Sequence, residues 1–77
     1  MFEFEIVLRS FQQVQQFVEL ASQQHFDVRV GNHWQNINGK DFMGMFSLDY
    51  SQPVRVSAHC SQEDFDSFRE AVMQRLV

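Results

Sequence analysis

The three histidines are the side chains of this sequence with the widest chemical range. His25, His33 and His59 could serve as metal ligands or as acid–base groups, because imidazole titrates near neutral pH. None of them has a carboxylate or a second histidine at a spacing typical of a metal site or a catalytic pair. We therefore predict that each is an ordinary surface residue and that the chain binds no metal ion.

Ser10 and Cys60 are the remaining candidates for nucleophilic chemistry. A serine needs a neighbouring base, and the run Leu8–Gln12 supplies none. A helix cap, worth about 1 kcal/mol, explains Ser10 better. Cys60 ends an apolar alternation and is predicted to be a small core residue. With its three glycines scattered, the sequence also lacks a nucleotide-binding loop, so we predict no cofactor and no enzymatic activity.

Length and charge restrict the classes of protein that remain. The 77 residues, 44% of them hydrophobic, predict one domain over 1–77 with a small core rich in its nine phenylalanines. A net charge of −4 argues against nucleic acid or an anionic membrane as a partner, because both need a basic surface. No segment is typical of a signal peptide or a membrane span, so we expect a cytoplasmic protein.

Apolar periodicity predicts the elements of the first half. Alternation predicts a strand over Phe2–Leu8. Ser10, with Gln13 three positions later as in a capping box, then opens a helix over about 11–23. A second alternation over Phe26–Val30, a turn at 31–33 and a weaker strand over Trp34–Asn38 predict a hairpin.

The second half repeats these signals. A short helix is expected over Phe42–Leu48 and a strand over Val54–Cys60. Ser61 caps a last helix whose inward residues are Phe65, Phe68, Val72 and Leu76. The order β-α-β-β-α-β-α predicts the α+β class, with a four-stranded antiparallel sheet covered by helices on one face.

From Phe17 onward the sequence resembles the HPr family, the phosphocarrier proteins of the bacterial sugar phosphotransferase system. The resemblance rests on Phe17-Val18, Ala21-Ser22, Asn38-Gly39-Lys40-Asp41, Phe42-Met43-Gly44-Met45-Phe46-Ser47-Leu48 and Ser61-Gln62-Glu63-Asp64. It implies the HPr fold, an open-faced β-sandwich of the same element order.

The departures from the family pattern concern its phosphoryl site. The position of the phosphoacceptor histidine falls on Ser10, and that of the arginine beside it falls on Gln12. The segment before the first helix is also several residues shorter than in the family. The resemblance therefore implies a regulatory or binding module that is not phosphorylated on histidine. The alternative is an active phosphocarrier that uses His25, His33 or His59.

The family's regulatory serine falls on Asp41. One interpretation is structural: Asp41 caps the short helix by accepting a hydrogen bond from a helix amide. The other is that its carboxylate replaces a phosphoserine permanently, with a smaller charge. Both stay open on the sequence.

The resemblance also implies a docking surface. In the family, the apolar residues of the short second helix and the start of the first helix face outward and bind partners. Here these positions are Phe11, Gln12, Phe42, Met43 and Phe46. The alternative is that the large Phe side chains fill the core. The expected partner is a protein: a phosphotransferase-system component, a transcription regulator or a metabolic enzyme.

Overall fold

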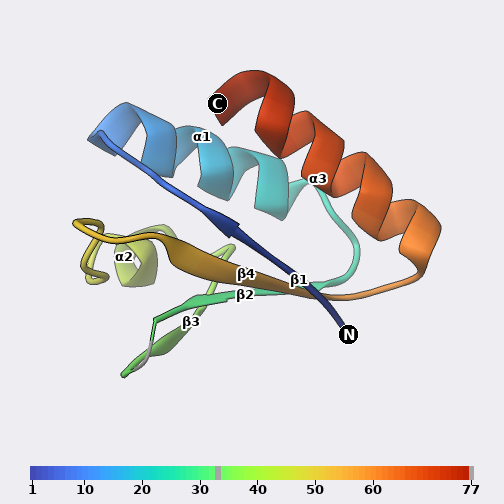
Figure 1. Ribbon diagram of the computed structural model, residues 1–77, viewed down its shortest axis with the longest axis horizontal. Helices are drawn as coiled ribbons and strands as arrows, with labels where there is room; N and C mark the ends of the chain where they lie inside the picture. Colours follow the sequence, from blue (N-terminus) through green and yellow to red (C-terminus); the bar gives the residue numbers. More distant parts are fainter. Residues whose placement is uncertain (33, 77) are drawn as a thin grey trace.

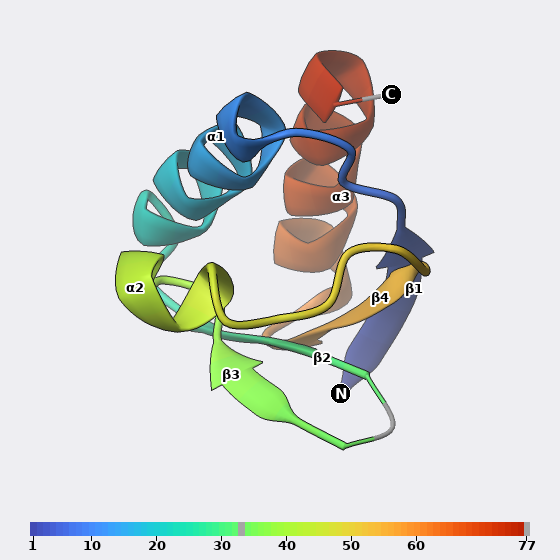
Figure 2. The same cartoon turned by 90° about the vertical axis from the view of Figure 1, so that its left-hand side faces the viewer.

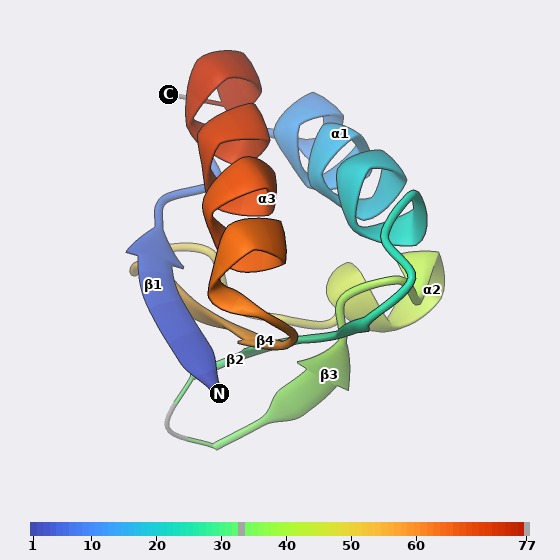
Figure 3. The same ribbon diagram turned by 90° about the vertical axis from the view of Figure 1, so that its right-hand side faces the viewer.

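The computed structural model describes residues 1–32 and 34–76, and its element order is the predicted β-α-β-β-α-β-α. The strands β1–β4 form one antiparallel sheet in the order β1-β4-β2-β3. Helices α1 and α3 lie side by side on one face of this sheet, and the other face is uncovered (Figures 1, 2 and 3). The elements are β1 (Phe2–Ile6), α1 (Phe11–Ser22), β2 (Asp27–Gly31), β3 (Asn36–Asn38), α2 (Phe42–Met45), β4 (Val54–His59) and α3 (Gln62–Leu76).

Strand β1 is shorter than the alternation predicts. Its register with β4 runs from Phe2 opposite Ala58 to Ile6 opposite Val54. The residue before Val54 is Pro53, which has no N–H to extend the ladder, so the strand ends at Ile6. Leu8 is nevertheless buried, and it reaches the core from the connection to α1.

The start of α1 confirms the predicted cap with one difference. The Ser10 Oγ accepts a hydrogen bond from the Gln13 amide at 3.2 Å. The Gln13 Oε1 accepts one from the Arg9 amide at 2.6 Å, whereas in a capping box the donor is the amide of the cap residue itself. The backbone amides of Arg9 and Gln13 therefore both have a hydrogen-bond acceptor.

The hairpin strand predicted from Trp34 is wrong at its beginning, because β3 starts only at Asn36. The Asn32 Oδ1 accepts hydrogen bonds from the amides of Trp34 and Gln35 at 2.8 and 2.9 Å. These amides are therefore occupied by an Asx turn and do not enter the sheet. Trp34 is 90% exposed. The neighbouring strand also begins one residue later than expected, at Asp27.

The short helix α2 ends earlier than the predicted limit at Leu48, after Met45. It lies close to β3 at Gly44: a Cβ at this position would stand 2.8 Å from the Ile37 Cγ2 and 2.8 Å from the Asp41 Oδ2, so these side chains would have to shift. Figure 2 shows α2 beside β3 and below α1. This packing places α2 next to the start of the molecule's first helix and so sets the geometry of the candidate site.

Helix α3 confirms its predicted cap and inward face. The Ser61 Oγ accepts a hydrogen bond from the Asp64 amide at 3.2 Å. The four predicted inward residues are all buried. Phe68, which is 1% exposed, receives the rings of Phe4, Phe17 and Phe26 edge-on, with centroids 5.8–6.2 Å apart. Cys60 is only partly buried and packs against the core.

Candidate functional site

The start of α1 carries Ser10 at the position where the family resemblance places a phosphoacceptor histidine. Its hydroxyl is engaged as the helix cap, and Gln12 beside it is exposed. His25 follows the opposite end of this helix. His59 lies beyond the residue that pairs with Phe2, at the other end of β1 from Ser10. Neither of these histidines lies at the start of α1 beside Ser10, and His33 falls outside the described residues.

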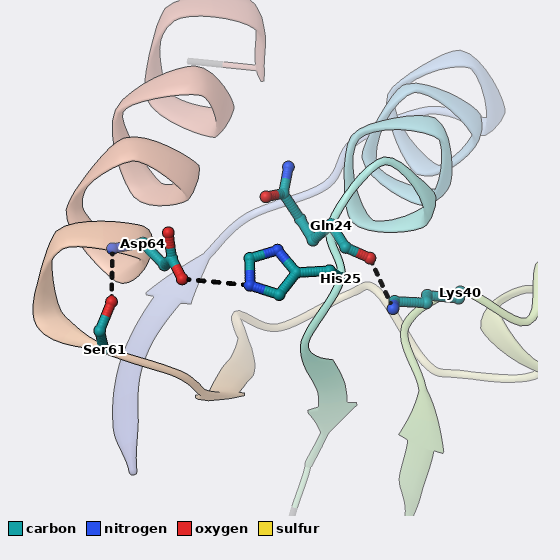
Figure 4. Close-up of polar contacts among 5 residues, drawn as sticks. All are labelled: Gln24, His25, Lys40, Ser61 and Asp64. Carbon is teal, nitrogen blue, oxygen red and sulfur yellow. Dashed lines mark hydrogen bonds and ion pairs between the residues drawn. The ribbon is translucent and has the colours of Figure 1, made fainter.

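The structure brings a carboxylate to His25 that the sequence spacing does not reveal. The His25 Nε2, on the connection after α1, lies 3.4 Å from the Asp64 Oδ2 in the first turn of α3 (Figure 4). The imidazole is 81% exposed, and such surface pairs contribute about 0–1 kcal/mol. Beside it, the Lys40 Nζ donates to the Gln24 carbonyl oxygen at 2.8 Å. These contacts hold the connection after α1 against α3 and the segment that follows β3.

Phe11 of α1 meets α2 in a cluster of aromatic rings. The Phe46 ring lies between the two others, with its centroid 5.2 Å from that of Phe11 and 4.7 Å from that of Phe42. Phe11 and Met43 are each 76% exposed, Phe42 is 42% exposed, and Phe46 is partly buried. We call Phe11, Phe42, Met43 and Phe46 the aromatic surface.

The alternative in which the Phe side chains of the short helix fill the core is therefore wrong for Phe42, which is 42% exposed, whereas Phe46 packs partly against the core. Large apolar side chains gathered on a surface are typical of a protein-binding site, and aromatic residues are frequent anchors there. The structure thus brings together the rings of three of the five residues predicted for docking, and Gln12 and Met43 are exposed beside them in the sequence. That they bind a partner stays a prediction.

A groove of about 540 Å³ adjoins the aromatic surface between Phe11 and Phe46. Leu8, Val14, Leu48 and Tyr50 supply most of its apolar lining, and Arg9 and Ser10 stand at its edge. The groove could receive an apolar side chain of a partner. Tyr50 gave no signal in the sequence, because its place in the groove depends on the fold of the connection from α2 to β4.

Tyr50 is held by a hydrogen bond from its hydroxyl to the carbonyl oxygen of Met45, at the end of α2. Burial raises its pKa to about 12. The neighbouring Asp49 is exposed, and its pKa is lowered because the Ser51 hydroxyl and then the Ser51 amide donate hydrogen bonds to the carboxylate. The groove wall is therefore built by local hydrogen bonds on both sides of Tyr50.

The raised pKa of Tyr50 predicts that the fold loses stability at alkaline pH. The phenol titrates at 10.0 without burial and at about 12 in the folded chain. Between these values the folded chain keeps a proton that the unfolded chain releases, so this contribution to the free energy of unfolding is fully present below pH 10.0 and is lost as the pH rises through about 12. Urea unfolding across this range, for the wild type and Tyr50→Phe, measures the effect.

The Tyr50→Phe variant should lack this pH-dependent contribution. At neutral pH it should lose about 1 kcal/mol, because the hydrogen bond from the phenol to the Met45 carbonyl oxygen is removed. An identical decline of stability in the two proteins above pH 10.0 would contradict the assignment to Tyr50.

Asp41 stands at the N-cap position of α2 but does not act as the predicted cap. Within the described residues, no helix amide donates a hydrogen bond to its carboxylate, and its backbone carbonyl accepts from the Met45 amide. The Asp41 Oδ2 instead lies against Gly44. The capping interpretation is therefore wrong, because the single turn of α2 leaves the carboxylate beside the helix and not over its first amides.

The described residues hold no group of three or more metal-ligating side chains. Over the same part of the chain, no helix is long and apolar enough to cross a membrane.

No family model and no curated protein sequence matches this chain. Among solved structures, it is similar to HPr-C-His from Thermoanaerobacter tengcongensis, with 24% identity, a TM-score of 0.76, and coverage of 96% of this chain and 93% of the other. It is also similar to the phosphocarrier protein HPr from Bacillus anthracis, with 17% identity, a TM-score of 0.75, and coverage of 99% and 96%.

The chain has the HPr fold. The Bacillus subtilis catabolite repression protein Crh, described as a domain-swapped dimer, is similar over 92% of this chain and 86% of its own, with 21% identity and a TM-score of 0.65. These similarities confirm the predicted architecture.

Asp41 is the residue that the family resemblance aligns with the regulatory serine, and its truncation tests whether it caps α2. Asp41→Ala should change the free energy of unfolding by less than about 0.5 kcal/mol, since no capping bond is lost. Urea unfolding measures this change. A loss of about 1 kcal/mol would restore the capping interpretation.

Asp41→Ser is the matched variant for the phosphoserine-mimic interpretation. It replaces the charged carboxylate with a neutral hydroxyl, so the affinity for a partner that recognises phosphoserine should fall. Unchanged affinity in this variant would leave Asp41 without a role in binding.

Proposed function

We propose that this chain is a divergent member of the HPr family that binds a protein partner as a regulatory module and carries no phosphoryl group on histidine. The observation that supports the proposal most directly is Ser10, which the family resemblance aligns with the phosphoacceptor and whose hydroxyl caps α1. A phosphohistidine needs an imidazole nitrogen and donors for the phosphate oxygens, and Ser10 with Gln12 supplies no imidazole.

The other histidines are poor substitutes. The Asp64 carboxylate beside the His25 imidazole would repel an incoming phosphoryl group. His59 is exposed on the uncovered face of the sheet, away from the aromatic surface. The proposal therefore separates the two parts of the HPr site: the phosphoryl-transfer chemistry is lost and the docking surface is retained.

The aromatic surface supports a protein partner of the kind the family binds, namely a cytoplasmic phosphotransferase-system component, a transcription regulator or a metabolic enzyme. Its ring cluster joins the start of α1 to α2, so one partner would contact both elements at once. Desolvated aromatic anchors often cost more than 2 kcal/mol of binding free energy when truncated.

Binding to the purified general phosphotransferase enzyme, or to another purified partner once found, tests the proposal through Phe11→Ala and Phe42→Ala. Each variant should weaken binding by about tenfold or more, measured by calorimetry. Trp34→Ala is the matched control, because Trp34 is an exposed aromatic outside the aromatic surface, and it should bind as the wild type does. Equal losses in all three variants, or none, would contradict docking at the aromatic surface.

A further inference from the structure

Strand β1 forms one border of the sheet, because its only neighbour in the sheet is β4. Figure 3 shows β1 at this border. An edge strand directs part of its backbone N–H and C=O groups away from the sheet, where water or another extended chain must satisfy them. Within residues 1–32 and 34–76, no turn, loop or cap forms a backbone hydrogen bond with β1.

The border at β1 lacks a bulge, a proline and a lysine, which are three features that keep edge strands from pairing. Its register with β4 is continuous over the five residues Phe2–Ile6. The opposite border is β3, which has only the three residues Asn36–Asn38. Strand β1 is therefore the border that can accept a further strand of ordinary length.

The two faces of β1 determine which side chains an added strand would carry. Phe2 and Phe4 pack against the core and are only partly buried, and the Phe2 ring stacks on Phe65 of α3 with centroids 5.0 Å apart. Glu3 and Glu5 alternate with them and are exposed on the uncovered face. Because opposite residues of neighbouring strands share a face, an added strand would place one set of side chains beside the two rings and the other set beside the two carboxylates.

Glu3 and Glu5 are also the only charged side chains of β1. On the side of β4, the Ser57 Oγ donates a hydrogen bond to the Glu3 Oε2 at 3.2 Å, and Arg55 is the register partner of Glu5. In the part of the chain that the structure describes, neither carboxylate has a basic nitrogen within 4.0 Å, since the two ion pairs found there involve other residues. Both carboxylates can therefore accept a cation from the free side of the strand.

We propose that the border at β1 binds an extended segment of a partner protein as a fifth strand, in which apolar and basic side chains alternate. The backbone of the segment would pair with Phe2–Ile6, as in other cases of strand addition. Its apolar side chains would cover Phe2 and Phe4, and its lysines or arginines would lie beside Glu3 and Glu5. This surface is separate from the aromatic surface and shares no residue with it.

A second copy of this chain fits the border at β1 poorly. Two β1 strands related by a two-fold axis would run antiparallel, with their uncovered faces on the same side. Such a pairing brings the carboxylates of both copies together on one face, whether Glu3 lies opposite Glu3 or opposite Glu5. Like charges at opposite positions destabilise a strand pair, so a basic segment is favoured over a second copy.

The test uses two synthetic peptides of about nine residues, long enough to pair with the whole of β1. The first alternates valine with lysine, and the second has glutamate in place of each lysine. Amide chemical shifts of the isotope-labelled chain report where each peptide binds and how tightly. Hydrogen exchange of the same amides shows whether the backbone of β1 has gained hydrogen bonds.

The lysine peptide should shift the amides of Phe2–Ile6, and the glutamate peptide should not bind. Exchange of the outward-facing amides of this strand should slow by about tenfold or more in the complex, because they gain acceptors. The amides of Asn36–Asn38, at the opposite border, should keep their exchange rates.

The double variant Glu3→Gln with Glu5→Gln should weaken binding of the lysine peptide about tenfold, because two cross-strand charge pairs are lost. Glu19→Gln with Glu70→Gln is the matched control, since it makes the same change of charge at exposed positions of α1 and α3. It should bind the peptide as the wild type does. Circular dichroism verifies that each variant is folded.

Four outcomes would overturn the proposal. Equal binding of the two peptides would show that the glutamates do not select the ligand, and shifts in β1 without slower exchange would show that no strand is added. Shifts confined to Phe11, Phe42 and Phe46 would place the peptide on the aromatic surface. A dimer of the chain alone in sedimentation, lost in a Phe4→Pro variant, would make a second copy the occupant. Each result leaves the proposed function intact, since that depends on the aromatic surface and on phosphoryl transfer.

Discussion

After incubation with phosphoenolpyruvate and the general phosphotransferase enzyme, the chain should remain unmodified by mass spectrometry. The reason is that the position which the family resemblance assigns to the acceptor imidazole holds Ser10, whose hydroxyl is occupied as the cap of α1. A serine hydroxyl without a neighbouring base is a poor nucleophile, so the expected rate is that of the uncatalysed background. The absence of transfer would be complete on the timescale on which HPr itself is phosphorylated.

An acid-labile adduct of one phosphate would contradict this expectation. Substituting His25, His33 and His59 one at a time would then identify the acceptor and would favour the alternative of an active phosphocarrier. HPr in the same reaction is the positive control.

The double variant Ser10→His with Gln12→Arg sharpens this prediction, because it restores the residue types without the family's longer connection. The new imidazole would sit at the N-cap position, where Gln13 already bonds the Arg9 amide. A displacement of about 1 Å from the productive geometry can cost about 100-fold in rate. A rate close to that of HPr would show that the shorter connection is no obstacle.

Phe68→Ala should be the most destabilising single substitution of the core, at about 3–5 kcal/mol. The ring is 1% exposed, and it joins Phe4 of β1, Phe17 of α1 and Phe26 before β2 through edge-to-face contacts. Removing the Phe68 ring opens a cavity between α3, α1 and β1 that the neighbouring side chains cannot fill. For a chain of this size the loss approaches the whole stability of the fold.

Urea unfolding measures this loss, with Phe11→Ala as the matched control. Phe11 is 76% exposed, so its truncation should change the free energy of unfolding by less than about 1 kcal/mol. Similar losses in the two variants would mean that Phe68 does not hold the core together.

Local signals in the sequence predict the secondary structure of this protein well. The helix caps at Ser10 and Ser61 depend only on residues within one or two turns, and so does the apolar periodicity. Both can therefore be predicted without the tertiary structure. The errors occur where a nearby residue occupies or removes a backbone hydrogen-bonding group of the sheet, which the apolar pattern does not reveal. Asn32 takes the amides of Trp34 and Gln35 away from β3, and Pro53 ends the ladder that Leu8 would otherwise extend.

The candidate site is only half predictable in the same way. The family resemblance placed Phe11, Phe42 and Phe46 on one docking surface, but the contact of their rings arises from the packing of α2 beside α1. Asp41 shows the reverse case: aspartate is a favoured cap, yet a single helical turn held close to β3 leaves its carboxylate without an amide to accept from.

Contacts between residues distant in the chain were decided by the tertiary structure alone. The pairing of His25 with Asp64 and the groove between Phe11 and Phe46 have no signature in residue spacing. The physical reason is that hydrophobic burial is non-directional: periodicity says which face of an element is apolar, and only the packing of the whole chain says which partner covers it.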